Sequence, residues 1–332
     1  MIAVLVQTLA PIYSRMRDSF FSKEKRVVLI VAGLLFLISL PFLALHWIKK
    51  RQWSALKKSL SKQLRNSAER DTVILWFSVC KHLMTLPYRN LPRLKKAIDF
   101  VTWIDRHPEV IQQVKTIKII IQMKTLPALI GKFHEATNLD IAGLKIERLS
   151  PEIGQLTQLT NADISRNHLV TLPSEISSLS SLTNLNLSWN QLVNLPAEIG
   201  QLKCLITLNL AHNCLEELPV ELGGLSRLTN LNLSKNRLRI IPDEVSQLKQ
   251  LITFDLSYND LYELSSQIDK LVNLRDLNLH ENPLQQLPKA FLSLSMECKI
   301  TLTANSLGRL TLERFCGGGP QLIFISKIDF EL

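Results

Sequence analysis

The sequence is poor in aromatic residues and glycine, and none of its cysteines are closely spaced. Aromatic residues make up 6% of the 332 residues and glycine occurs 11 times, which excludes collagen-like and low-complexity chains. The five cysteines form no CxxC or CxC pair, so the sequence indicates neither a zinc site nor a disulfide-capped secreted fold. They are Cys80, Cys204, Cys214, Cys298 and Cys316. Isolated thiols of this kind are typical of a reducing compartment.

Sequence patterns of catalysis are also missing. The seven histidines form no HExxH or other close ligand pair. The glycine-rich stretch FCGGGPQ (315–321) lacks the Lys-Ser/Thr of a phosphate-binding loop, and Cys316 has no base beside it. The sequence therefore predicts a protein that is not an enzyme, with no metal, no cofactor and no small-molecule substrate.

Charge is distributed unevenly along the chain, whose formal net charge is +10. Residues 1–135 contain 23 Lys or Arg and 8 Asp or Glu, whereas residues 136–332 contain 16 and 21. The basic excess therefore belongs to the N-terminal part alone. The mild acidity of the remainder argues against nucleic-acid binding there, while the basic part is suited to an anionic surface.

The longest hydrophobic run, residues 27–48, contains no charged side chain. A helix of about 20 residues crosses the ~30 Å hydrocarbon core of a bilayer, so this run predicts a transmembrane helix. Trp47 and Trp53 lie at its end, where indole side chains prefer the membrane interface. A cleaved signal peptide and a buried core helix remain as alternatives, although the run is long for the first and no A-x-A site follows it.

The segments that flank this run set the expected orientation. Five basic residues precede it and seven follow it within about 20 residues, which favours a cytoplasmic C-terminal side. Residues 1–26 form an N-terminal segment that either lies in the membrane interface or serves as an export signal. Residues 49–124 are expected to be a basic juxtamembrane and helical connector, whose first part either contacts anionic lipid or is a solvated linker.

Residues 125–310 contain a repeat of 23 residues. Leu-Pro pairs keep this step at 172–173, 195–196, 218–219 and 287–288. Asparagine recurs at the same interval without interruption, at Asn167, Asn190, Asn213, Asn236, Asn259, Asn282 and Asn305. A fixed period of this length predicts stacked units, with residues 311–332 as a C-terminal tail or cap.

Each unit contains a short strand followed by a return segment. In LTNLNLSWNQL (182–192), Leu185 and Leu187 alternate into a core from the strand. The amide of Asn190 is then expected to pair with backbone groups of the stacked units, because an unpaired buried backbone group costs about 1–3 kcal/mol. The segment PAEIGQL (196–202) supplies a helical or 3-10 return that buries Ile199 and Leu202. Such units are unstable alone and stable when stacked.

The unit LPAEIGQLKCLITLNLAHNCL (195–215) resembles the 23-residue intracellular class of leucine-rich repeat proteins, typified by Ras-group and Scribble-type proteins. The resemblance covers residues 125–310. It implies an α/β solenoid, a right-handed horseshoe with parallel strands on its concave face, and a role in protein–protein binding. No functional residue carries over from it beyond the structural Leu, Asn and Pro positions.

A candidate partner-binding site lies on the expected concave face, to which positions 184, 186, 188 and 189 of each unit point if the leucines between them point inward. The column equivalent to position 189 changes chemistry in every unit: Arg166, Trp189, His212, Lys235, Tyr258 and Glu281. The column equivalent to 186 is polar, and the predicted site includes its Asp163 and Asp255. Because an exposed tryptophan is a candidate binding anchor, the site is centred on Trp189, His212, Lys235 and Tyr258.

Three functions remain open at the level of sequence. The first is a single-pass membrane protein whose cytoplasmic repeats bind another protein as a scaffold or adaptor. The second is a bacterial effector that is exported to a host cell and binds a host protein at a host membrane. The third is a subunit that recruits substrate to an enzyme complex. In each case the predicted partner is an unidentified protein, and residues 27–48 contact a membrane.

Overall fold

The computed structural model describes residues 108–119, 122–295, 297–303 and 321–325, together with Leu75, Asp105 and Arg106. All of them lie in the second of two units, residues 65–332. The predicted segments 1–26 and 27–48, most of the connector 49–124, and Asn305 lie outside the described residues. Within the described ranges, no helix has the length and apolar character that crossing a bilayer requires.

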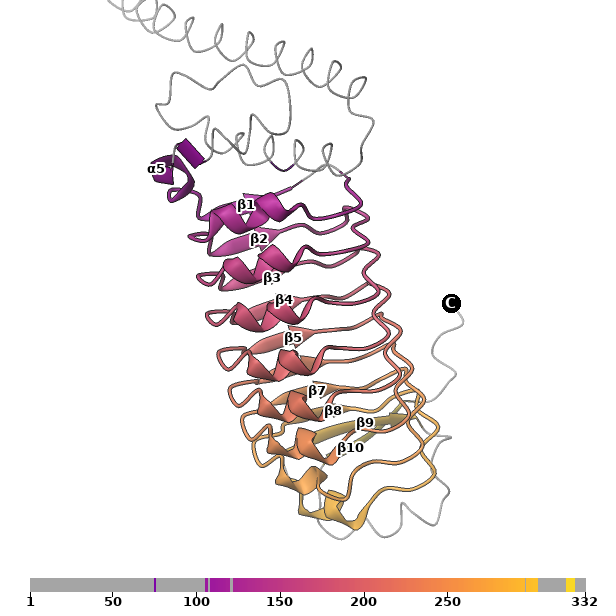
Figure 1. Ribbon diagram of the computed structural model, residues 1–332. Helices are drawn as coiled ribbons and strands as arrows, with labels where there is room; N and C mark the ends of the chain where they lie inside the picture. Colours follow the sequence, from indigo (N-terminus) through magenta and orange to yellow (C-terminus); the bar gives the residue numbers. More distant parts are fainter. Residues whose placement is uncertain are drawn as a thin grey trace, which may run out of the picture. The chain divides into compact units, whose positions relative to one another are not determined.

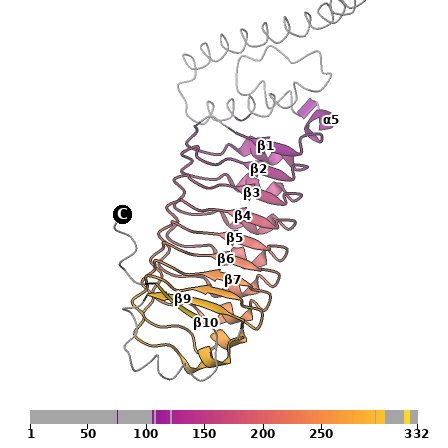
Figure 2. The ribbon, with the colours of Figure 1, turned by 180° about the vertical axis from the view of Figure 1, so that it is seen from behind.

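The described residues form a solenoid built on one parallel sheet, which Figure 2 shows with its strands stacked in chain order. Each strand pairs with the next, so that Leu185 lies between Ala162 and Leu208 of the neighbouring strands. The ten strands are β1 (Thr116–Lys118), β2 (Asn138–Asp140), β3 (Asn161–Asp163), β4 (Asn184–Asn186), β5 (Thr207–Asn209), β6 (Asn230–Asn232), β7 (Thr253–Asp255), β8 (Asp276–Asn278), β9 (Lys299–Thr303) and β10 (Gln321–Ile325).

Helical segments return the chain on the other side of the solenoid (Figure 1). A short α-helix, α5 (Pro108–Ile111), precedes β1. The returns from β1 to β9 are 3-10 helices: η1 (Ala128–Phe133), η2 (Pro151–Gln155), η3 (Ser174–Ser178), η4 (Ala197–Gln201), η5 (Val220–Gly224), η6 (Asp243–Gln247), η7 (Ile268–Lys270) and η8 (Lys289–Ser293). The helical layer of the predicted α/β solenoid is therefore made of 3-10 helix.

The Leu-Pro pairs explain where most of the returns begin, although η7 begins after Gln267 without a proline. Pro196 precedes η4 with φ −67° and ψ 145°, and a proline ring holds φ near this value. The N–H of Ile199 then donates to the Pro196 carbonyl at 3.0 Å, and the N–H of Leu202 donates to the Ile199 carbonyl at 3.2 Å. Hydrogen bonds over three residues define a 3-10 turn, which suits a segment of only five residues.

The core fills the space between the sheet and the 3-10 helices. Leu185 and Leu187 are 1% and 0% exposed, and Ile199 and Leu202 are both fully buried. Phe254 takes the leucine position of β7 and is also fully buried. Burying a side chain of this size contributes about 1.5–3 kcal/mol. Because the same positions recur in each unit, every unit buries its apolar side chains against the next.

Buried asparagine side chains connect neighbouring repeats beyond the end of each strand. The Oδ1 atom of Asn213 accepts the backbone N–H of Leu192 at 3.0 Å. Its Nδ2 atom donates to the carbonyls of Leu187 and Leu210, both at 3.0 Å. The same three contacts recur in other repeats, where they are made by Asn190, Asn236, Asn259 and Asn282. Each amide thus pairs backbone groups of its own and the preceding repeat.

The sheet extends beyond the repeat range 125–310 at both ends. β1 lies in the range 49–124, for which the sequence predicts a helical connector, and its Ile117 is fully buried beside Leu139 of β2. The strand forms because Ile117 can continue the column of inward side chains while its two neighbours remain exposed. At the other end β10, within the predicted tail 311–332, pairs in parallel with β9 over five residues.

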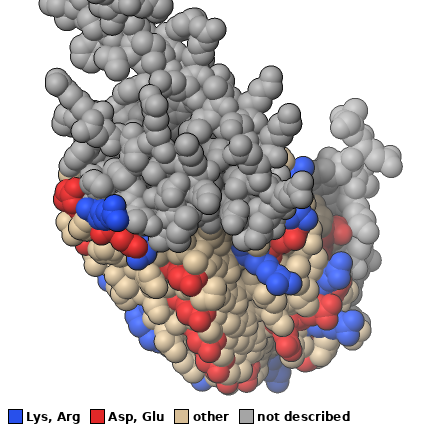
Figure 3. Space-filling model, turned by 45° about the horizontal axis from the view of Figure 1, so that its top comes forward, with Lys and Arg blue, Asp and Glu red and all other residues tan. Residues whose placement is uncertain are grey.

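The face of the 3-10 helices carries a row of carboxylates, which Figure 3 shows following one another along the repeats. Each member lies in the first turn of one helix, where a negative charge suits the partial positive charge of the unpaired N–H groups. The row consists of Glu152, Glu175, Glu198, Glu221 and Glu244. Part of the acidic surface of the repeats therefore lies on the side away from the sheet.

Candidate functional site on the sheet face

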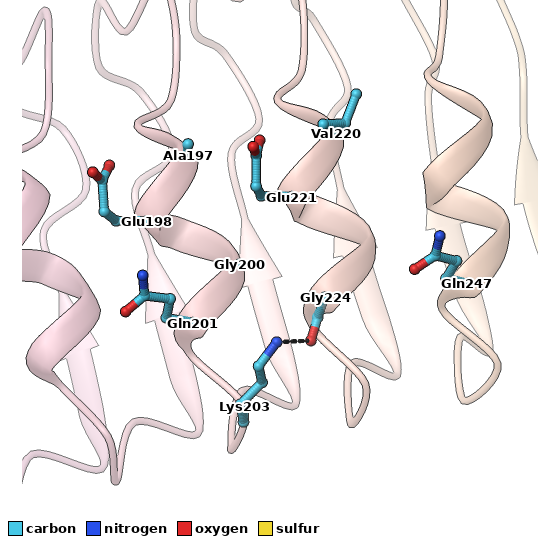
Figure 4. Close-up of a pocket in the computed structure, with 9 residues that line it drawn as sticks. All are labelled: Ala197, Glu198, Gly200, Gln201, Lys203, Val220, Glu221, Gly224 and Gln247. Carbon is cyan, nitrogen blue, oxygen red and sulfur yellow. Dashed lines mark hydrogen bonds between the residues drawn. The ribbon is translucent and has the colours of Figure 1, made fainter.

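One hollow lies over η4 and η5 and has a volume of about 510 Å³ (Figure 4). It opens because Gly224 has no side chain at the position that Gln201 and Gln247 occupy in the adjacent repeats. The ammonium group of Lys203 donates to the Gly224 carbonyl at 2.8 Å, so the cation of this hollow is bound within the fold. We attribute the hollow to the missing side chain rather than to a binding site.

The second hollow lies on the exposed face of the sheet, which we call the sheet face, and has a volume of about 350 Å³. It corresponds to the concave face that the sequence predicts. Its lining is rich in amides and hydroxyls: Thr207, Leu208, Asn209, Asn230, Leu231, Asn232, Thr253 and Asp255. These groups can both donate and accept hydrogen bonds, which suits contact with a polar backbone.

Beside this hollow runs the column that the sequence singles out, which we call the variable column. Its members are Arg166, Trp189, His212, Lys235, Tyr258 and Glu281. All six have left-handed backbone, with φ between 53° and 57°. The conformation aims each N–H at the next repeat, where Trp189 donates to the Ala211 carbonyl at 2.9 Å. The inter-repeat ladder is thereby extended past the end of each strand.

Left-handed backbone is costly for bulky side chains. A non-glycine residue in this region costs on the order of 1–2 kcal/mol, and for tryptophan or tyrosine it is uncommon. Gly143 fills the equivalent position of an earlier repeat with φ 71°, and a Cβ atom there would have no neighbouring atom within 4 Å. The fold therefore accepts glycine at this position and does not itself require a large side chain there.

The large side chains of the variable column contact one another in a row. The rings of Trp189 and His212 stack with centroids 3.6 Å apart and planes 13° from parallel. The Arg166 guanidinium lies 6.0 Å from the Trp189 ring, and the Lys235 ammonium lies 5.2 Å from the Tyr258 ring. Cations over ring faces are attracted by the negative π surface. Along the repeats, the row therefore presents the Arg166 cation, the two stacked rings, the Lys235 cation and the Tyr258 ring.

Two aromatic members of the row remain accessible. Trp189 is 51% exposed and Tyr258 is 39% exposed. Burial lowers the pKa of the His212 imidazole below its usual range, and the nearby Lys235 charge lowers that pKa further. Both causes favour the neutral ring, which is the form that stacks on the indole without carrying a charge toward Lys235.

The members of the polar column have a second role inside the chain. One oxygen of Asp163 accepts the backbone N–H of Ser165, and one oxygen of Asp255 accepts that of Ser257, both at 3.0 Å. Such bonds close a turn two residues after the aspartate and allow the left-handed residue that follows. Asp163 and Asp255 therefore shape the strand ends, in addition to lying on the predicted binding surface.

One part of the expected surface is wrong. The sequence places position 188 on the exposed face, but Ser188 and its equivalent Ser257 are only 7% and 5% exposed. Their hydroxyls donate to Asn186 and Asp255 at 2.8 and 2.7 Å, within the turn that follows each strand. His280, in the same column, is also buried and meets Tyr258 edge-on with ring centroids 5.4 Å apart. This contact was not expected from the sequence, although a histidine in a column of serines and alanines marked the position.

Glu281 lies at the end of the variable column and differs from the other members. Its N–H donates to the Thr303 hydroxyl at 2.5 Å, and its carboxylate lies 3.9 Å from His280 Nε2. It therefore turns toward buried groups and does not continue the row of rings. No group of three His, Cys, Asp or Glu side chains that could hold a metal ion lies within the described residues.

Comparison with known proteins agrees with the solenoid geometry. Family models described as leucine-rich repeat match residues 181–202 and 226–284. The matched segments include β4 and β6 to β8, with the buried asparagines that follow them. Together with the parallel sheet and the 23-residue period, these matches define the described region as a leucine-rich repeat solenoid. No curated protein matches the sequence significantly.

Two of the solved structures with a similar fold are receptors. One is the leucine-rich repeat ectodomain of the plant membrane receptor kinase GASSHO1/SCHENGEN3 from Arabidopsis thaliana, in complex with CASPARIAN STRIP INTEGRITY FACTOR 2. It is 28% identical, with a TM-score of 0.50, over 64% of this chain and 30% of that one. A TDR receptor is 23% identical, with a TM-score of 0.54, over 68% and 45%. The chain thus spans less than half of either structure, and the second likeness concerns the fold alone.

Proposed function

We propose that this protein is a membrane-anchored, non-catalytic leucine-rich repeat protein of the 23-residue intracellular class, which binds a protein partner through its sheet face as a scaffold or adaptor. The observation that carries the proposal is the row formed by the variable column. Large exposed side chains occupy a backbone position where the fold accepts glycine, so the row is best explained by contact with a partner.

The GASSHO1/SCHENGEN3 ectodomain, which was solved in complex with another factor, lends support by analogy of fold. Aromatic side chains are common energetic centres of interfaces, and Trp189 and Tyr258 are both exposed in this row. The proposal places the partner across β4 to β7, where the row and the hollow of about 350 Å³ lie side by side along the same strands.

The membrane anchor is part of the proposal and rests on the sequence of residues 27–48. We expect the chain to remain in the membrane pellet after alkaline extraction, because a helix of this length buries its apolar side chains in the hydrocarbon core. The basic flanks favour a cytoplasmic solenoid. Recovery of the protein in the supernatant would contradict the anchor without bearing on the binding face.

Replacing Trp189 and Tyr258 together by glycine is expected to weaken partner binding by about tenfold or more, since each loses an exposed aromatic contact. Glycine is suited to the left-handed backbone at both positions, so the solenoid should stay folded. The measurement is affinity capture with the full chain from cells that produce it, with bound proteins quantified by mass spectrometry.

The matched control removes two other exposed apolar side chains, Val220 and Tyr262, which lie outside the variable column. A partner that is retained by the Val220→Ala, Tyr262→Ala chain and lost by the double glycine variant supports the proposal. Equal capture by the wild type and both variants would show that the row is not an interface.

A further inference from the structure

The row has a charge pattern as well as an aromatic one. Arg166 and Lys235 lie on either side of the Trp189–His212 stack and direct their charges at rings. Within the described part of the chain, neither forms an ion pair with a carboxylate at 4 Å or less, whereas Lys118 on the same sheet pairs with Asp140 at 2.5 Å. Two positive charges at the sheet face thus remain available to an anionic partner.

The surface between these charges is neutral. The two strands between them, β4 and β5, end in Asn186 and Asn209, and β6, which Lys235 follows, ends in Asn232. Aspartates end only the strands at the edges of this stretch, where β3 ends in Asp163 and β7 in Asp255. A carboxylate that approaches the stack would therefore meet amides rather than like charges. This arrangement favours a partner with negative charge over one with positive charge at the centre of the row.

The separation of Arg166 and Lys235 sets the spacing that the negative charges of a partner must have. Neighbouring parallel strands lie about 4.8 Å apart, so Arg166 and Lys235, three rungs apart, are separated by about 14 Å along the solenoid axis. An extended peptide advances about 3.3–3.4 Å per residue, so residues four apart are separated by about 13.5 Å. The residue midway, on the same side of the peptide, then falls between Trp189 and His212.

The polar lining of the sheet-face hollow suits such a peptide. An extended chain leaves its N–H and C=O groups unpaired, and each must find a partner when water is excluded. Asn209, Asn230 and Thr253 offer donors and acceptors within the hollow. Side chains of the peptide can then reach the variable column while its backbone contacts the amides.

We propose that the sheet face binds an extended peptide segment that carries two carboxylates four residues apart, with an apolar side chain midway between them. Arg166 and Lys235 bind the carboxylates, and the apolar side chain packs on the Trp189–His212 stack. This proposal specifies the chemistry of the partner that binds the sheet face, and it rests on the function proposed above. The pattern reads the same in both directions, so it holds for either orientation of the peptide.

The test uses fluorescence anisotropy of labelled peptides titrated with the detergent-solubilised full chain. The probe is Ser-Glu-Ser-Leu-Ser-Glu-Ser, blocked at both ends. One control replaces both glutamates by glutamine, and a second, Ser-Ser-Glu-Leu-Glu-Ser-Ser, has the same composition with the carboxylates two residues apart. The probe is expected to bind about tenfold more tightly than the glutamine peptide and several-fold more tightly than its isomer.

Variants of the protein assign the preference to the two cations. Arg166→Gln with Lys235→Gln is expected to bind the probe and the glutamine peptide equally. The matched control, Arg227→Gln with Arg239→Gln, removes two exposed charges elsewhere and should keep the preference. The preference should also fall as salt is raised, since exposed charges are screened within about 10 Å at 0.1 M.

The outcomes separate this inference from the proposed function. If the double glycine variant loses its cellular partner but the probe, its isomer and the glutamine peptide bind alike, the binding face stands and the acidic motif is overturned. Tighter binding of a single-stranded oligothymidylate than of the probe, lost in the Arg166, Lys235 variant, would also overturn it in favour of base stacking. If the Arg166, Lys235 variant still preferred the probe to the glutamine peptide, the two cations would not be the groups that bind the carboxylates.

Discussion

Replacing Asn213 by alanine is expected to lower the free energy of unfolding by about 3 kcal/mol, because buried backbone groups lose their partner. The N–H of Leu192, which donates to Asn213 Oδ1 at 3.0 Å, is left without this acceptor. The carbonyls of Leu187 and Leu210 each lose one donor and keep a second from the asparagine of an adjacent rung. Urea unfolding of the solubilised chain, followed by far-ultraviolet circular dichroism, measures the loss.

Asn184→Ala is the matched control for this variant. Asn184 is an exposed residue of β4, and its amide donates to the Asn161 and Thr183 side chains, which water can also reach. We expect this change to alter the free energy of unfolding by less than about 0.5 kcal/mol. A loss below about 1 kcal/mol for Asn213→Ala would mean that the amide ladder contributes little to the stacking of the repeats.

Replacing Gly200 by alanine is expected to cost about 2–3 kcal/mol, for a steric reason. A Cβ atom at Gly200 would lie 2.1 Å from the backbone carbonyl oxygen of Glu221 in the next repeat. The obstacle is backbone, so η5 would have to move away from η4. The gain in helix propensity from glycine to alanine, about 1 kcal/mol, is too small to offset this. The midpoint of thermal or urea unfolding gives the difference.

Ser177→Ala provides the comparison, since position 177 is the equivalent of Gly200 in the preceding repeat. That repeat already carries a Cβ atom at this site, so the change removes only the hydroxyl that donates to the Ser174 carbonyl at 2.9 Å. We expect an effect of about 0.5–1 kcal/mol. If Gly200→Ala were no more harmful than Ser177→Ala, the close approach of η4 and η5 would not be a constraint.

Much of the solenoid follows from the spacing of residues. The interval between Asn190 and Asn213 predicts that they lie in adjacent repeats. Both amides are buried, and each accepts a backbone N–H from the preceding repeat. The Leu-Pro pairs likewise indicate where the returns begin, as Pro196 does for η4. The ends were less predictable, because β1 and β10 pair with their neighbours without the asparagine and Leu-Pro pattern that marks the central repeats.

The surface of the site was harder to foresee. The sequence shows that Trp189 and Tyr258 occupy a variable column, but the column also holds Gly143, whose presence was the available sign of left-handed backbone. Asp163 and Asp255 were expected only to meet a partner, and they also close turns within the chain. Such turns depend on local backbone angles that residue type alone does not fix.

By itself, the sequence determined which leucine and asparagine positions are buried and the order in which the repeats stack, because a period of 23 residues returns each position to the same place in the stack. Only the tertiary structure decided that Trp189 stacks on His212 with Arg166 and Lys235 on either side. Neighbouring members of this row are 23 residues apart along the chain, and their contact depends on the strand separation and on the left-handed backbone that they share.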